Sequence, residues 1–130
     1  MAATWTSNDA WVLAAIAMRP QAKTLAELIA TADAINHSVF NEAEFCQSIG
    51  RLLPAGLIGV DHQADRYWPT PEGTAIRKRW RHGMFTWADA IAPQLERLGQ
   101  PLNTPWSLPA GNFDRALDSY RASFARYLGR

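Results

Sequence analysis

The chain has 130 residues, of which 48% are hydrophobic and 19% charged, with a formal net charge of +1. This balance is typical of one globular domain spanning 1–130, and it excludes a disordered chain. No apolar run approaches the ~18 residues of a membrane span, and the N-terminus lacks the basic flank and apolar stretch of a signal peptide. The lone Cys46 cannot build a disulfide framework. We therefore expect a cytoplasmic protein without membrane contact.

The first two predicted helices precede residue 37. Apolar residues recur at helical spacing from Ser7 to Arg19, with Ser7 as the expected cap. Thr24 and Glu27 form a capping box that begins the second helix, which is expected to end near 36–37.

A third helix is predicted from a second capping box, Asn41 with Glu44, and Phe40 is placed to pack on Phe45 as a hydrophobic staple. The helix should end near Gly56, which suits a left-handed cap. Its expected buried stripe is Phe45, Ile49, Leu52 and Leu53. Its expected outward strip is Ala43, Glu44, Gln47, Gly50, Arg51 and Pro54.

Residues 57–60 and 66–68 predict two short strands around a polar turn, which makes a β-hairpin. Thr70 then caps a fourth helix with Pro71 at its first position, and this helix should carry Ile76 and Trp80 inward and stop near Gly83.

The C-terminal part predicts two more helices. The first runs from Met84 to Leu98, and Pro93 leaves a kink or a split open. After an ordered loop over 99–111, the last helix begins at an Asn112 cap. Its apolar residues fall within an arc of roughly 100°. These residues are Phe113, Ala116, Leu117, Tyr120, Phe124, Tyr127 and Leu128.

This order of elements is that of a winged helix-turn-helix. The stretch Gly56-Leu57-Ile58, followed by Tyr67-Trp68-Pro69-Thr70-Pro71-Glu72-Gly73, resembles bacterial winged-helix regulators of the MarR and PadR kind over residues 7–80. The chain is also similar to uncharacterised bacterial winged-helix proteins that carry the stretch found here at Ala32–His37. The resemblance implies a winged-helix core at 7–82, to which 84–130 would be a C-terminal helical extension.

DNA binding by such a fold would place the third helix in the major groove and the hairpin beside a phosphate backbone. Two acids, Glu42 and Glu44, would sit at the leading end of the third helix, and the hairpin turn holds Asp61 and Asp65 against Arg66. Both are poorly suited to phosphates. The candidate DNA contacts are Gln47, Arg51, Arg66, Arg77, Lys78, Arg79 and Arg81.

Catalytic and metal-binding motifs are not recognisable. The histidines His37, His62 and His82 are scattered, with no ligand spacing that joins them to Cys46. His37 is better interpreted as a helix cap or a packed residue, and Cys46 as a small buried hydrophobe. We expect no enzyme activity, no metal and no cofactor.

Six tryptophans in 130 residues are unusual. An aromatic core explains part of them, but Trp5, Trp87 and Trp106 are candidates for a protein interface, where tryptophan is enriched. Our first hypothesis is a non-enzymatic winged-helix module that acts through protein–protein contact, as a homodimer or with another bacterial protein. The alternative is a DNA-binding transcriptional regulator. The last helix would serve as a dimer arm or as a lid on its own domain.

Overall fold

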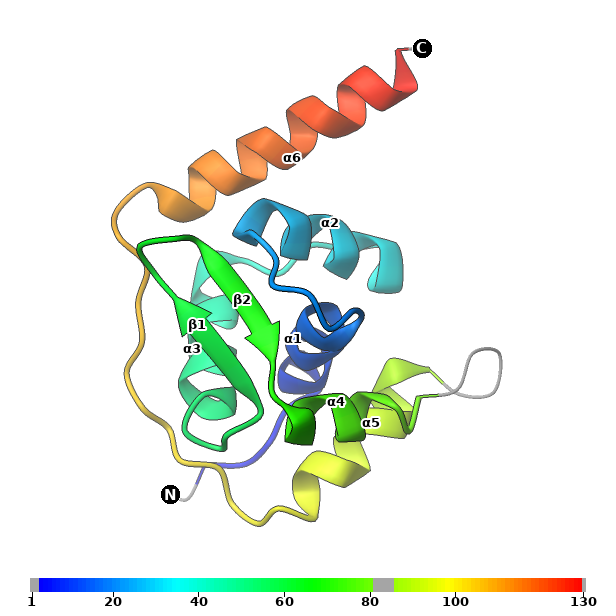
Figure 1. Ribbon diagram of the computed structural model, residues 1–130, viewed down its shortest axis with the longest axis vertical. Helices are drawn as coiled ribbons and strands as arrows, with labels where there is room; N and C mark the ends of the chain where they lie inside the picture. The colour runs from blue at the N-terminus through cyan, green and yellow to red at the C-terminus, as the bar shows by residue number, and fades with distance from the viewer. Residues whose placement is uncertain (1–2, 81–85, 130) are drawn as a thin grey trace.

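The computed structural model describes residues 3–80 and 86–129. These residues form three helices, a two-stranded hairpin and three further helices (Figure 1). The elements are α1 (Ser7–Ala17), α2 (Leu25–Asn36), α3 (Glu42–Leu52), β1 (Ile58–Asp61), β2 (Arg66–Pro69), α4 (Pro71–Arg77), α5 (Trp87–Glu96) and α6 (Asn112–Leu128). The predicted fold class, mainly helical with a small hairpin and a C-terminal helix, is confirmed, and the shape is winged-helix-like.

Helix α1 lies at the centre and packs against α2, α3, α4, α5 and β2. Every residue from Asp9 to Ala17 is buried. The expected cap at Ser7 is wrong, because Thr6 and Asp9 form a capping box in which each side chain accepts a hydrogen bond from the other residue's N–H. The helix ends at Ala17, two residues before the expected Arg19.

Both predicted capping boxes are confirmed. In α2, the Thr24 N–H donates to Glu27 Oε1 over 2.9 Å and the Glu27 N–H donates to Thr24 Oγ1 over 3.1 Å. Asn41 and Glu44 form the same reciprocal pair in α3. The predicted left-handed Gly56 follows α3 with φ +77°. Local sequence therefore fixes where these two helices begin.

An aromatic cluster joins α1 to the start of α3. The predicted staple is confirmed, since Phe40 stacks on Phe45 with 5.2 Å between ring centroids. Trp11 of α1 meets Phe40 edge-on at 5.2 Å, and Phe113 of α6 lies 6.5 Å from it. Phe40 thus contacts aromatic residues from both α1 and α6, so the N- and C-terminal helices belong to one hydrophobic core.

The hairpin is confirmed, with β1 antiparallel to β2 and Ile58 opposite Pro69. Gly59 pairs with Trp68, whose indole ring lies directly over it. A Cβ at position 59 would lie 2.3 Å from the ring, so only glycine fits beneath this indole. The other edge of β2 is also paired, because Lys23 and Tyr67 exchange two backbone hydrogen bonds of 2.8 and 2.9 Å. The segment between α1 and α2 therefore anchors the hairpin to the helical core.

The fourth and fifth helices are shorter than predicted. Thr70 caps α4 as expected, but α4 ends at Arg77, and the expected continuation toward Gly83 reaches into 81–85, outside the described residues. The expected start of the next helix, Met84, also falls there. Thr86 caps α5, which passes Pro93 without a split and ends at Glu96, two residues before the expected Leu98.

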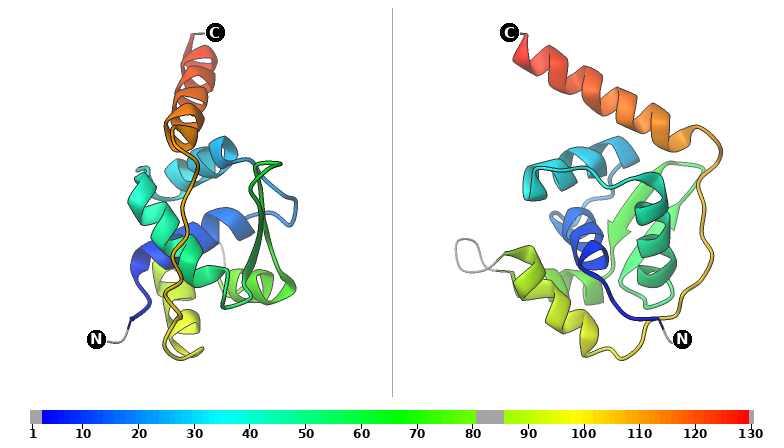
Figure 2. Two further views of the ribbon diagram at one scale, coloured as in Figure 1. Left: turned by 90° about the vertical axis from the view of Figure 1, so that its left-hand side faces the viewer. Right: turned by 180° about the vertical axis from the view of Figure 1, so that it is seen from behind.

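Residues 101–111, called the strap below, contain no helix or strand and run along the outer side of α3 to α6 (Figure 2). Helix α6 then lies across α2 and extends beyond it. Its N-cap is Gly111, with φ +82°, in place of the expected Asn112. Phe113 alone of the predicted apolar stripe is fully buried, and Phe124, Tyr127 and Leu128 are exposed.

Candidate functional site

On the outer face of α3, where a winged-helix protein would read DNA, the strap covers Gly50 and leaves Glu44 and Gln47 exposed. The Thr104 N–H donates a 3.0 Å hydrogen bond to the carbonyl of Gly50, and a Cβ at Gly50 would lie 2.1 Å from the Thr104 carbonyl oxygen. One turn earlier, Trp106 packs edge-on against Phe45 with 6.0 Å between ring centroids. Gly50 therefore lies on the outer side of α3, but the expectation that it is open there is wrong, because the absence of a side chain admits the strap.

Arg51, also predicted to face outward, is 6% exposed and forms an ion pair with Asp9. Its Nη1 lies 3.1 Å from Asp9 Oδ2, and its Nε donates to Asn103 of the strap over 3.4 Å. Asp9 is fully buried, so the carboxylate requires this counterion. The guanidinium is thereby turned from the outer face toward α1.

Two further polar side chains complete this buried cluster. Ser48 donates to Asp9 Oδ1 over 2.6 Å and accepts a 2.8 Å hydrogen bond from Asn8 Nδ2. Leu53, predicted to be buried with Ile49 and Leu52, is 36% exposed at the end of the helix. Phe45, Ile49 and Leu52 of the predicted stripe are buried, and Ser48 and Arg51 add a second, polar set of inward positions beside them. The signal for this polar cluster is the single acid in the apolar sequence of α1.

The remaining candidate DNA contacts do not form one surface. Arg66 lies at the hairpin turn, where its Nη1 donates to the carbonyls of Ala64 and Asp65. Lys78 and Arg79 are exposed just after α4, which leaves the hairpin at its opposite end. Gln47 is exposed on α3 beside the strap, and Arg81 lies outside the described residues.

Arg77 is the most constrained of these bases. It is half-buried, its guanidinium carbon lies 5.2 Å from the centroid of the Trp80 ring, and its Nη2 contacts Met18 Sδ at 3.2 Å. Contacts of this kind favour a packing role for the long side chain.

All three tryptophans proposed for an interface are half-buried. Trp5 donates from Nε1 to the Gly99 carbonyl over 2.8 Å, and Trp87 stacks on Trp11 at 6.3 Å. Trp106 packs beside Phe45 and the His62 ring. Each holds a C-terminal segment to the core, and a role at an interface stays a prediction.

The exposed apolar surface lies at the end of α6. Phe124, Tyr127 and Leu128 are 48%, 72% and 65% exposed, and at 100° per residue they continue the face that Phe113 buries. We call these three residues the α6 tip. Helix α2 has 12 residues and α6 has 17, so α2 is too short to cover the whole face. The sequence pattern identified this face but not the length of its partner.

A cavity of about 480 Å³ lies between α2 and the α6 tip. Ala30 and Ala34 line it on the α2 side, with Phe124 and Tyr127 on the α6 side. At its edge the Tyr120 hydroxyl donates to Asp33, and this hydrogen bond raises the pKa of Tyr120 to about 12, with a smaller contribution from burial. The small side chains of α2 leave an apolar groove beside the α6 tip.

The charges of the two helices that form this groove are opposite. Helix α2 carries Glu27 and Asp33 and no base, whereas residues 119–129 of α6 carry Arg121 and Arg126 and no acid. The positively charged end of α6 therefore complements the negatively charged surface of α2, in the same molecule or in a second copy.

The histidine and cysteine side chains are the remaining candidates for metal ligands or reactive groups. Within the described residues, no three His, Cys, Asp or Glu side chains are placed to hold a metal ion. His37 ends α2 with φ +53° and donates its N–H to the Asp33 carbonyl over 2.7 Å, which is the expected capping role. Burial raises the pKa of the half-buried Cys46 thiol. Over 3–80 and 86–129, no helix combines the length and apolar character of a membrane span.

Comparison of the chain with models of known protein families, with curated proteins and with solved structures gives no match. The winged-helix resemblance therefore rests on the residues and on the arrangement of the elements alone.

Proposed function

We propose that this chain is a non-enzymatic winged-helix module that acts through protein–protein contact, and that its first partner is a second copy of itself. The observation that carries the proposal is the α6 tip, where three large apolar side chains are between 48% and 72% exposed. Exposed apolar residues that continue a packed face are typical of interaction surfaces.

A second copy fits this surface because each molecule carries both the α6 tip and the groove between α2 and α6 that would receive it. The tip of one copy, with Arg121 and Arg126 beside it, would enter the groove between α2 and α6 of the other, next to the acids of α2. In a dimer with a two-fold axis this contact occurs twice, because each copy inserts its tip into the groove of the other. Such an isologous interface is closed and limits association to a dimer.

The part of the outer face of α3 that the strap covers supports protein contact over DNA reading. The strap is bonded to Gly50 and Arg51, and the hairpin turn is bonded to the start of α2 through Asp65, whose carboxylate accepts from the Leu25 N–H over 3.2 Å. DNA binding would require a free helix face and a free wing.

The test is the mass of the protein in solution, measured by light scattering after gel filtration from about 1 to 100 µM, which covers dissociation constants in the micromolar range. We expect a dimer that becomes monomeric in the double variant Phe124→Glu/Tyr127→Glu. The control is Ala122→Glu, which adds one negative charge, against two in the double variant, on the opposite side of α6 and should leave the dimer intact. A monomeric wild type, or a dimer unaffected by the double variant, would contradict the proposal.

DNA binding remains the second candidate, favoured by the winged-helix-like shape and by the exposed Arg66, Lys78 and Arg79. It is tested with a labelled random duplex over a salt series. Each phosphate engaged contributes about −0.9 to the slope of log affinity against log salt. Micromolar binding with a steep slope, lost when all three bases are changed to alanine, would replace the first proposal with a regulator.

A further inference from the structure

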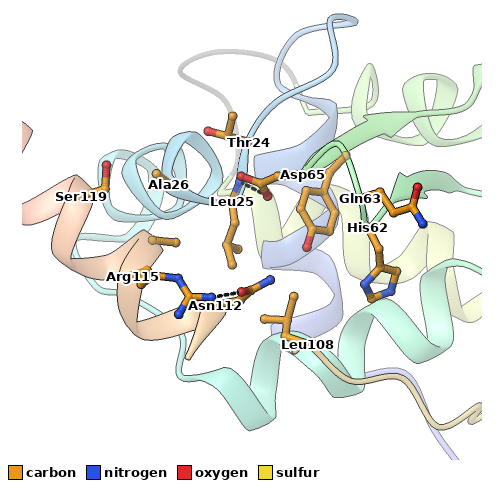
Figure 3. Close-up of a pocket in the computed structure, with 12 residues that line it drawn as sticks. Thr24, Leu25, Ala26, His62, Gln63, Asp65, Leu108, Asn112, Arg115 and Ser119 are labelled. Atoms are coloured by element: carbon orange, nitrogen blue, oxygen red, sulfur yellow. Dashed lines mark hydrogen bonds between the residues drawn. The ribbon is translucent and has the colours of Figure 1, made fainter. Parts of the chain in front are cut away.

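A polar cavity of about 430 Å³ lies where the start of α2, the hairpin turn and the first turns of α6 meet (Figure 3). Leu25, Leu108 and Ala116 supply apolar walls. This volume lies within the range of small-molecule sites in proteins. The cavity is separate from the groove beside the α6 tip, with which it shares no lining residue.

Two opposite charges face this cavity without meeting. Asp65 approaches from the hairpin turn and Arg115 from α6, and Figure 3 shows them on opposite sides of the space. Within the described residues the only ion pair joins Asp9 to Arg51, so the Asp65 and Arg115 charged groups are more than 4 Å apart. The lining thus offers a separated anion and cation.

Both charges are held in place by local hydrogen bonds. Asp65 adopts φ +53°, and its Oδ1 accepts from the Leu25 N–H, which leaves Oδ2 without a partner in the described part of the chain. Arg115 donates from Nη2 to the Asn112 side chain, one turn earlier on α6. Each side chain therefore keeps hydrogen-bonding capacity for a ligand.

A hydroxyl in the wall of the cavity points to the same ligand. Tyr67 is 2% exposed, and its ring is fixed edge-on against Phe45 and Trp106. Its hydroxyl makes no hydrogen bond to residues 3–80 or 86–129, although Tyr67 lines the cavity. The hydroxyl is not among the buried polar atoms that lack a partner, so it opens onto the cavity that Tyr67 lines, where a ligand is able to accept its hydrogen bond. Burial raises the pKa of Tyr67, so the hydroxyl keeps its proton to donate.

We propose that this cavity binds a free α-amino acid, whose carboxylate contacts Arg115 and the Tyr67 hydroxyl and whose ammonium group contacts Asp65. A plain anion would be repelled by Asp65 and a plain cation by Arg115, whereas a zwitterion satisfies both. The site joins three segments that are far apart in the chain, so its occupant would hold the first turns of α6 to the hairpin turn.

The probes are the twenty common L-amino acids, added in pools of four at about 10 mM each to the ¹⁵N-labelled full chain, which detects dissociation constants up to the millimolar range. We expect one or more pools to shift the amide signals of residues 24–26, 62–67 and 112–119 in a saturable way. The active amino acid is then compared with its N-acetyl derivative and its carboxamide. Each derivative lacks one charge and should bind about tenfold more weakly.

The variants Asp65→Asn and Arg115→Gln should each weaken binding about tenfold, and Tyr67→Phe should weaken it several-fold. Asp118→Asn on α6 and Arg97→Gln after α5 are the matched controls, because both positions are exposed and lie outside the cavity, so the affinity should stay unchanged. The spectra themselves report whether each variant is folded. No saturable shift from any pool, equal binding of either derivative, or binding unaffected by the three cavity variants would overturn the proposal.

Discussion

The Thr104 N–H donates a hydrogen bond to the carbonyl of Gly50, which attaches the strap to the side of α3 at a position where no side chain intervenes. This contact decides what the outer face of α3 is able to touch. It also makes Gly50 the simplest position at which to test the packing of the strap.

Replacing Gly50 by alanine should destabilise the protein by about 1–3 kcal/mol, because a backbone oxygen has to move away from the new Cβ. Alanine favours helix over glycine by about 1 kcal/mol, and the clash outweighs that gain. The midpoint of urea unfolding, followed by tryptophan fluorescence, measures the change. Gln47→Ala on the same helix is the control, with an expected effect within about 0.5 kcal/mol. A Gly50→Ala protein as stable as wild type would mean that the strap is not packed on α3.

Changing Arg51 to methionine should cost about 3–5 kcal/mol, because it leaves the fully buried Asp9 carboxylate without its counterion. In the double variant Asp9→Asn/Arg51→Met the cost should be smaller than the sum of the two single changes. Arg66→Met, at the exposed hairpin turn, is the control. Additive losses would show that the two side chains are not energetically coupled.

Two phenylalanines on α6 provide a matched pair. Phe113→Ala should lower the unfolding free energy by about 3–5 kcal/mol, since the ring is 4% exposed and packs near Phe40. Phe124→Ala should change it by less than about 0.5 kcal/mol in dilute protein, because this ring is 48% exposed. Both are measured by urea unfolding at low protein concentration. Similar losses at the two positions would contradict the exposed placement of the α6 tip.

The hydrogen bond from Tyr120 to Asp33 predicts a loss of stability at alkaline pH. The folded pKa of Tyr120, about 12, lies above its ordinary value of 10, so the folded state holds this proton more tightly than the unfolded state. Its contribution is fully present below pH 10 and is lost as the pH rises through about 12.

The melting temperature of wild type should therefore fall more steeply above pH 10 than that of Tyr120→Phe. Asp33→Asn removes the acceptor charge and should also flatten the dependence. Identical profiles for wild type and both variants would show that α6 is not held to α2 by this hydrogen bond.

Features encoded by neighbouring residues were predictable from the sequence. The capping boxes at Thr24 and Asn41, the Phe40 staple and the hairpin depend on side chains a few positions apart, so local patterns identify them. The end of α1 and the cap at Thr6 were missed by one or two residues, which is the usual uncertainty at helix ends.

The features that a periodic pattern could not predict depend on distant partners. Arg51 was assigned to the outer face because a pattern on α3 does not reveal the buried acid on α1. The stripe of α6 was recognised, but its exposed end depends on the length of α2. The cavity between the hairpin turn and α6 combines Asp65, Tyr67 and Arg115, and no local motif links residues brought together only by the tertiary fold.

The central position of α1 has a consequence for the growing chain during synthesis. This helix is made first, yet one of its main packing partners, α5, is made after residue 86. Until α5 leaves the ribosome, the buried stretch from Asp9 to Ala17 has one side uncovered and open to misassociation. A chain that ends before residue 87 therefore lacks part of the cover of α1, and we expect it to aggregate more readily than the full 130 residues.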